Sequence, residues 1–284
     1  KTGSTRTFYN LNATDAVNGI IKYKFTAMNN GCTKDSSIAI RVNTLPEISF
    51  ETTSGRDKNG VRIVCVNEEF ELKAVAENSS FIWNTTENSE TITKKHQNTG
   101  SVNYIVTATN KTTQCSNKNT YTVNVVENPI IKINDEIAGE SAVCENSEIT
   151  LEASGLNNGN YIWYDETDNT QKEIANSTEK YTTTITTNKK YRVEGKDENE
   201  CPGSATFNIT TKGNPTFKFN HSPICVGENA VISLTERSEN TRFAWSWENG
   251  LGSLENATSV NHKLESDRKY IVTAIKDNCI KTDS

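Results

Sequence analysis

Seven cysteines recur along the 284-residue chain at a nearly fixed spacing, and this period constrains the fold more than any other feature. We divide them into two interleaved series. The first-position cysteines are Cys65, Cys144 and Cys225, and the second-position cysteines are Cys32, Cys115, Cys201 and Cys279. Within each series, successive cysteines are separated by roughly 80 residues, and a fixed period of this length is typical of a tandem array of repeats.

The simplest interpretation places one cysteine of each series in every repeat and joins the two. It predicts three disulfides within repeats: Cys65–Cys115, Cys144–Cys201 and Cys225–Cys279. Cys32 is then bonded to a cysteine upstream of residue 1, so we expect the chain to be a window of a longer array. The alternative is seven free thiols in a cytosolic protein, but free thiols have no reason to recur in register. The spacing lacks Cys-x-x-Cys pairs and disfavours zinc, whereas disulfides predict an extracellular, oxidising setting.

Aromatic residues keep the same period. A tryptophan follows each first-position cysteine at a nearly constant distance, with another aromatic two positions before it: Trp83, Trp163 and Trp245. A pattern Tyr-x-(Val/Phe)-x-(Ala/Gly) precedes each second-position cysteine, also at a nearly constant distance, at Tyr23, Tyr104, Tyr191 and Tyr270. Residues two apart on a strand share a face. We therefore expect each tryptophan to be buried in the core beside the tyrosine of its own repeat, Tyr104, Tyr191 or Tyr270.

Proline marks the boundaries between repeats. An alternating stretch ends near each of Pro46, Pro129 and Pro215, and a new alternating strand follows at once. Proline suits the start of a strand and interrupts the preceding ladder. The predicted domains are residues 1–45, the C-terminal part of an immunoglobulin-like repeat; 46–129 and 130–213, two complete repeats; and 214–284, an immunoglobulin-like or PKD-like repeat lacking its last strand.

Strand content decides the fold class. The chain has 36 Asn and 38 Thr, residue types that favour turns, caps or strands over helix interiors. In residues 130–213 the patterns predict seven short strands: 130–133, 149–153, 161–164, 172–175, 181–186, 191–194 and 205–210. Seven strands with a cysteine, tryptophan, cysteine order indicate an immunoglobulin-like sandwich. The predicted architecture is all-β, with tandem sandwiches of about 80 residues arranged as beads on a string.

The repeat resembles the immunoglobulin-like and PKD-like modules of large Bacteroidota surface proteins, including gliding-type adhesins exported by type IX secretion. Three motifs carry the resemblance: the segment from Cys144 to Ala153, the Tyr-Ile-Trp strand at Tyr161, and the Tyr-x-Val strand before each second-position cysteine. The last repeat looks more PKD-like around Trp245, although the acidic Gly-Asp-Gly turn of that family is absent. The resemblance covers almost the whole chain and implies a stalk or spacer on a cell surface.

Few residues suggest chemistry. His96, His221 and His262 lie in polar stretches with no triad-like neighbours, so we expect solvated surface histidines. The acidic loops 165–168 and 197–200 could ligate calcium, but they lack dedicated loop spacing and are better explained as solvated turns. Trp247 is the only tryptophan outside the periodic position and is a candidate ligand contact, with packing as the other explanation. No catalytic residue, metal ligand or cofactor is predicted.

These observations predict a non-catalytic structural and adhesive segment of a secreted surface protein, the stalk or filament of an adhesin. The alternative is a string of accessory modules, with carbohydrate affinity, attached to a secreted enzyme. Expected partners are neighbouring repeats of the same chain; further candidates are cell-surface machinery, surface polysaccharide and other copies of the chain. A net charge of −6 without basic clusters disfavours nucleic acid, and no apolar run is long enough to span a membrane.

Overall fold

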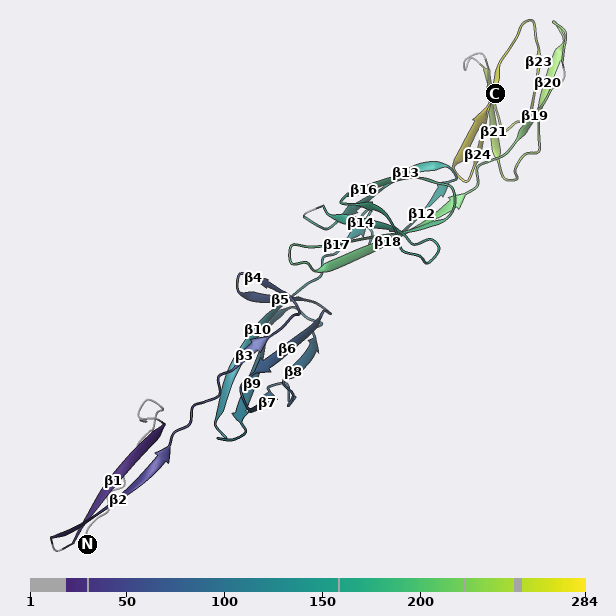
Figure 1. Ribbon diagram of the computed structural model, residues 1–284. Coiled ribbons are helices and arrows are strands. Elements are labelled where there is room, and N and C mark those ends of the chain that lie inside the picture. The colour runs from purple at the N-terminus through teal and green to yellow at the C-terminus, as the bar shows by residue number, and fades with distance from the viewer. Residues whose placement is uncertain (1–18, 30, 158, 222, 248–251) are drawn as a thin grey trace. The chain divides into compact units, whose positions relative to one another are not determined.

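Every secondary-structure element that the structure describes is a β-strand (Figure 1). The structure is a computed structural model that describes residues 19–29, 31–157, 159–221, 223–247 and 252–284. Part of the predicted segment 1–45 and part of the PKD-like stretch after Trp247 therefore lie outside the described residues. The chain divides into two compact units, residues 1–127 and residues 128–284. Among the described residues, no helix has the length and apolar character needed to cross a bilayer.

In the first unit, β1 (Ile20–Asn29) and β2 (Cys32–Arg41) form a hairpin. Residues 46–127 then form two sheets, with strand orders β3-β6-β8 and β4-β5-β10-β9-β7. Their bounds are β3 (Ser49–Glu51), β4 (Arg56–Lys58), β5 (Val61–Cys65), β6 (Glu69–Val75), β7 (Ser79–Trp83), β8 (Thr91–Lys95), β9 (Gly100–Asn110) and β10 (Ser116–Val126).

The core between these two sheets follows from period-2 alternation. In β7, Phe81 and Trp83 are buried while the intervening Ile82 is 62% exposed. The same alternation in β6 buries Phe70 and Leu72. Burying one face of each sheet against the other removes these side chains from water at roughly 1.5 to 3 kcal/mol per large residue. The result is a sandwich with one hydrophobic cluster.

The second unit contains two such sandwiches. Residues 130–213 form sheets β11-β13-β16 and β12-β18-β17-β14-β15, and residues 214–284 form sheets β19-β20-β23 and β22-β21-β24-β25. The bounds are β11 (Lys132–Ile133), β12 (Ala138–Cys144), β13 (Ser147–Ser154), β14 (Tyr161–Asp165), β15 (Lys172–Asn176), β16 (Lys180–Ile185), β17 (Lys189–Lys196), β18 (Pro202–Lys212), β19 (Lys218–Asn220), β20 (Asn229–Thr235), β21 (Arg242–Trp247), β22 (Gly252–Glu255), β23 (Ser259–Lys263), β24 (Tyr270–Lys276) and β25 (Cys279–Asp283).

The periodic tryptophans occupy the centre of all three cores. Trp83, Trp163 and Trp245 are at most 2% exposed, and each belongs to the same hydrophobic cluster as its expected tyrosine, with Tyr104, Tyr191 and Tyr270 also buried. Each indole N–H donates a hydrogen bond of 2.9 Å to a backbone carbonyl, of Ser89, Thr178 and Ala257 in turn. A buried indole therefore keeps its one polar group satisfied.

Two strands differ from the sequence-based expectation. β12 was missed because Ala138–Cys144 carries no alternating apolar pattern, and only one of its residues is fully buried. It is an edge strand that pairs in parallel with β18, held by backbone hydrogen bonds instead of by core burial. The last repeat was expected to lack its final strand, and this was wrong. A two-residue turn sends the chain back along β24, and Cys279–Asp283 forms β25.

Candidate functional site

The first-position cysteines all begin the same tight turn. The residue two positions after each of these cysteines has a positive φ in the left-handed region. Its N–H donates a hydrogen bond of 2.7 Å to a backbone carbonyl: Asn67 to His96, Asn146 to Ile185, and Gly227 to Leu264. Asn and Gly are the residue types that adopt this conformation at least cost. The three turns therefore present their cysteines in equivalent backbone settings.

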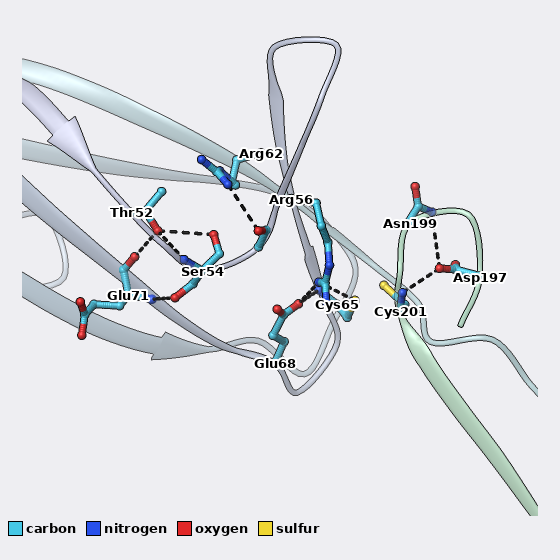
Figure 2. A network of polar contacts seen from close by, with 11 residues as sticks. Thr52, Ser54, Arg56, Arg62, Cys65, Glu68, Glu71, Asp197, Asn199 and Cys201 are labelled. Carbon is cyan, nitrogen blue, oxygen red and sulfur yellow. Dashed lines mark hydrogen bonds and ion pairs between the residues drawn. The ribbon is translucent and has the colours of Figure 1, made fainter. Parts of the chain in front are cut away.

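A glutamate fixes two of these turns. At Cys65 the Glu68 carboxylate accepts a hydrogen bond of 2.8 Å from the cysteine N–H and forms an ion pair of 2.5 Å with Arg56 (Figure 2). The same Arg56 nitrogen lies 3.2 Å from the Cys65 sulfur. At Cys225 the Glu228 carboxylate accepts the cysteine N–H at 3.1 Å. Cys65 is buried, whereas Cys225 is exposed.

The second-position cysteines follow the turn of the last hairpin. Cys279 opens β25 after a two-residue turn in which Asp277 and Asn278 both have positive φ, of 49° and 68°. Asp and Asn tolerate this conformation, which two-residue hairpins require. Before Cys201, one Asp197 carboxylate oxygen accepts the N–H groups of Asn199 and Cys201 at 2.9 and 2.8 Å (Figure 2).

The two cysteines of one repeat lie at opposite ends of its last strand. Cys201 immediately precedes β18, whereas Cys144 is level with Lys212, the final residue of that strand. Eleven residues of strand at about 3.3 Å each place the two cysteines roughly 36 Å apart. A disulfide needs a Cα separation below about 7 Å. The predicted bond Cys144–Cys201 is therefore wrong.

The same geometry separates the cysteines of residues 46–129. Cys115 immediately precedes β10, and Cys65 pairs with Val126 at the far end of that strand. The predicted bond Cys65–Cys115 is therefore also wrong, and Cys115 is a free, half-buried thiol. Cys65 and Cys201 are each disulfide-bonded.

Cys144 bonds instead to Cys279, with a Cα separation of 5.5 Å and a sequence separation of 135 residues. This disulfide joins the first position of one repeat to the second position of the next. It contradicts the predicted bond Cys225–Cys279 and leaves Cys225 free. Cys32 is also free and exposed in the structure, and its predicted upstream partner stays a prediction.

Polar contacts reinforce this junction. The Cys279 sulfur is fully buried and lies 3.9 Å from the carbonyl oxygen of Lys212. That same carbonyl accepts the N–H of Glu145 at 2.9 Å, and the Lys212 ammonium donates to the carbonyl of Asp277 at 3.4 Å. The Asn214 amide donates to the carbonyl of Glu145 at 2.8 Å. The hairpin tip of residues 214–284 is thus held against the end of residues 130–213 by a covalent bond and by hydrogen bonds from the connecting segment.

The disulfide adds a second covalent link between the two repeats, besides the backbone. It closes a long loop, and in the chain-entropy description such a bond stabilises the folded state by restricting the unfolded one. Because the bond crosses between repeats, separating them requires breaking it. Within the described residues, no group of three or more His, Cys, Asp or Glu side chains is arranged to hold a metal ion.

Two of the three histidines are packed, which corrects the expectation of solvated surface residues. His96 Nε2 lies 2.6 Å from the hydroxyl of Tyr104, and His262 Nδ1 lies 2.7 Å from that of Tyr270. Burial, with a smaller effect from Lys94, lowers the pKa of His96. Burial also raises the pKa of Tyr104 to about 12. Both histidines precede their tyrosine by eight residues, a period that could have been noticed in the sequence.

The acidic loops are occupied by local contacts. Asp165 forms an ion pair of 2.8 Å with Lys189, and Glu166 forms one of 2.6 Å with Arg192. The Arg192 hydrogen bond is the largest of the contacts that lower the pKa of Glu166. Asp197 caps its own turn, as described above. These contacts support the interpretation of loops 165–168 and 197–200 as structural turns.

Trp247 of β21 packs against Tyr270 of its own sheet and against His262 of the other sheet. Its ring centroid is 4.4 Å from that of His262 and 5.8 Å from that of Tyr270. A side chain in place of the hydrogen of Gly252 would come within 2.1 Å of the indole nitrogen, so β22 covers the indole closely. Trp247 is half-buried, as expected for the packing explanation.

Part of the chain matches a family of immunoglobulin-like domains. The model of one family, described as "Ig-like domain CHU_C associated", matches residues 135–215. No curated protein matches the chain. Among solved structures, three N-terminal domains of the bacteriophage RB49 highly immunogenic outer capsid protein are 15% identical with a TM-score of 0.34, covering 84% of this chain and 96% of that one. An I-band fragment from titin is 15% identical with a TM-score of 0.37, covering 84% and 97%.

Proposed function

We propose that these residues form a non-catalytic structural and adhesive segment of a long secreted surface protein, the stalk or filament of an adhesin. One observation carries the proposal: the Cys144–Cys279 disulfide joins successive immunoglobulin-like repeats. A bond within one repeat constrains that repeat alone, whereas a bond across a junction holds two successive repeats together under tension, in addition to the backbone. The resemblance to Bacteroidota surface arrays supports the placement of the stalk outside the cell.

Three further features support this role. The disulfides require an oxidising compartment. The Tyr, Trp and Cys positions recur in each repeat, so the common residues serve the architecture. The exposed Ile130 follows Pro129, whereas the polar residues Glu47 and Thr216 follow Pro46 and Pro215, so this apolar position is not shared by the repeats. The packing of Trp247 lends no support to carbohydrate-binding accessory modules, since its indole ring is packed against His262 and Tyr270.

The proposal is tested on intact cells that produce the full-length protein. A membrane-impermeant amine reagent should label lysines such as Lys180 and Lys218, whose side chains are 59% and 67% exposed. Deleting residues 130–213 in frame should shorten the surface structure seen by electron cryotomography and weaken attachment to a substratum. A protein that resists labelling until the cells are lysed, and whose Cys144 reacts with alkylating agents before reduction, would exclude a surface stalk.

A further inference from the structure

The free cysteines occupy the same positions in their repeats as the bonded Cys144 and Cys279 occupy in theirs. In the bond between Cys144 and Cys279, a first-position cysteine joins the second-position cysteine of the next repeat. Under the same rule Cys225 requires a second-position cysteine of a following repeat, and Cys115 requires a first-position cysteine of a preceding repeat. None of the seven cysteines of this sequence occupies either place. The free thiols are therefore the positions for which the rule supplies no partner within these residues.

The local structure of Cys225 is that of a bonded cysteine. Its N–H is held by Glu228 as the N–H of the disulfide-bonded Cys65 is held by Glu68, and the N–H groups of both glutamates return to the carbonyls of their cysteines at 3.1 and 3.0 Å. The two turns share the positive-φ residue at the same place. Cys225 differs in being exposed, and no described strand runs directly before it. Its sulfur is thus positioned by the same turn and remains accessible.

Cys115 occupies the place of Cys279 and Cys201 in the hairpin. It directly precedes β10, as Cys201 directly precedes β18, and its carbonyl accepts the N–H of Asn110 at 2.9 Å. The corresponding contact at Cys201 is its carbonyl with the N–H of Asp197 at 3.1 Å. Cys32 likewise opens β2 as Cys279 opens β25. Equivalent positions are disulfide-bonded in the other repeats, which is an observation independent of the free thiols themselves.

We propose that Cys225 and Cys115 each form a disulfide of the same kind across a repeat junction. Cys225 bonds to the second-position cysteine of the following repeat. Cys115 bonds to the first-position cysteine of the preceding repeat. Cys32 follows the rule for Cys115. Each bond joins two thiols, releases two protons and passes two electrons to an oxidised protein disulfide of a thiol–disulfide oxidoreductase, which becomes a dithiol. Each of these junctions is then covalently linked, like the junction that Cys144 and Cys279 join. The inference goes beyond the proposed function, since it concerns the bonding pattern and holds for any extracellular array.

Peptide mapping tests the pattern on the full-length protein as it is secreted. Thiols are blocked with N-ethylmaleimide, and the unreduced protein is digested with trypsin, which places the two cysteines in peptides 112–118 and 219–237. Neither peptide should carry the reagent. Peptide 219–237 should be linked to a second-position cysteine, recognised in the full sequence by the Tyr-x-Val motif upstream of it. Peptide 112–118 should be linked to a first-position cysteine, recognised by the periodic tryptophan downstream of it.

An internal control comes from the same digest. Peptides 133–172 and 277–281 should be recovered joined through Cys144 and Cys279, which shows that the protein was folded and oxidised. Migration on a non-reducing gel shows which chain supplies the partner cysteine. A protein that migrates as a monomer has the partner cysteine in the same chain, whereas a ladder of oligomers has it in a second copy. N-ethylmaleimide on Cys115 or Cys225, a bond between these two, or a bond to a cysteine in neither series would overturn the proposal. A free Cys225 on a surface-exposed stalk would leave the proposed function standing.

Discussion

At the scale of single residues, the periodic tryptophan determines whether a repeat folds. Trp83 is 2% exposed and its neighbour Ile82 is 62% exposed on the same strand. We expect Trp83→Ala to lower the free energy of unfolding of residues 46–127 by about 3 to 5 kcal/mol, because it leaves a cavity and an unpaired carbonyl at Ser89. The matched control Ile82→Ala should change it by less than about 0.5 kcal/mol. Urea unfolding followed by circular dichroism measures both; equal losses would contradict the core assignment.

His96 should make the stability of its repeat depend on pH. Burial lowers the pKa of folded His96, so the unfolded chain, with an ordinary histidine pKa near 6.5, binds the proton at higher pH. The free energy of unfolding therefore decreases as the pH falls below about 6.5 toward the folded-state pKa. Glu87, whose pKa is lowered to about 2 chiefly by its hydrogen bond with Lys94, stays charged throughout this interval.

The measurement compares urea midpoints at pH 7.5 and pH 5.5. The variant His96→Gln should show a smaller decrease between these two pH values than the unmodified protein. The control His221→Gln replaces an exposed histidine of the other unit and should retain the original decrease for residues 46–127. An unchanged decrease in His96→Gln would exclude His96 as its source.

At the scale of elements, the hairpin of β24 and β25 delivers Cys279 to the junction. Its two-residue turn needs positive φ at Asp277 and Asn278, which β-branched residues adopt at high cost. We expect Asn278→Ile to distort the hairpin register and raise the fraction of Cys144 that is alkylated before reduction. The matched variant Asn278→Gly keeps the turn and should leave Cys144 fully protected. Quantitative mass spectrometry of peptide 133–172 reads out both, and protection in Asn278→Ile would show that the turn is dispensable.

Sequence patterns predicted the strands whose side chains are buried in the core. They missed β12, which is held in place mainly by backbone hydrogen bonds. The alternation at Phe81 and Trp83 and the Tyr-x-Val strands lead directly to the sandwich cores. β12 has no such alternation, because its stability comes from parallel pairing with β18. Without β12, nothing indicates that Cys144 lies level with Lys212, about one strand length from Cys201. The period of the cysteines was therefore identified correctly, while the partners were assigned to the wrong repeats.

At the scale of the whole molecule, the junction disulfide couples the stability of two sandwiches. The bond spans 135 residues, for which the chain-entropy relation gives about 5 kcal/mol. We expect the double variant Cys144→Ser, Cys279→Ser to unfold at lower denaturant concentration by a free energy approaching this value. The comparison uses the 284-residue chain, in which Cys225 is a free thiol of the same unit, and there the control Cys225→Ser should have little effect. Denaturant titration of unreduced proteins makes the comparison, and coincident curves for all three would show that the bond adds no stability.

The bond between Cys144 and Cys279 also changes what a single broken peptide bond can do. A protease that cuts the backbone anywhere between these residues opens the loop without severing the molecule, since the two fragments remain tied through sulfur. Limited digestion at a loop such as 165–168 should therefore give one band on a non-reducing gel and two after reduction. Two bands without reductant would contradict the bond. Where secreted proteases are abundant, a protein cleaved once in this loop therefore stays in one covalently linked piece.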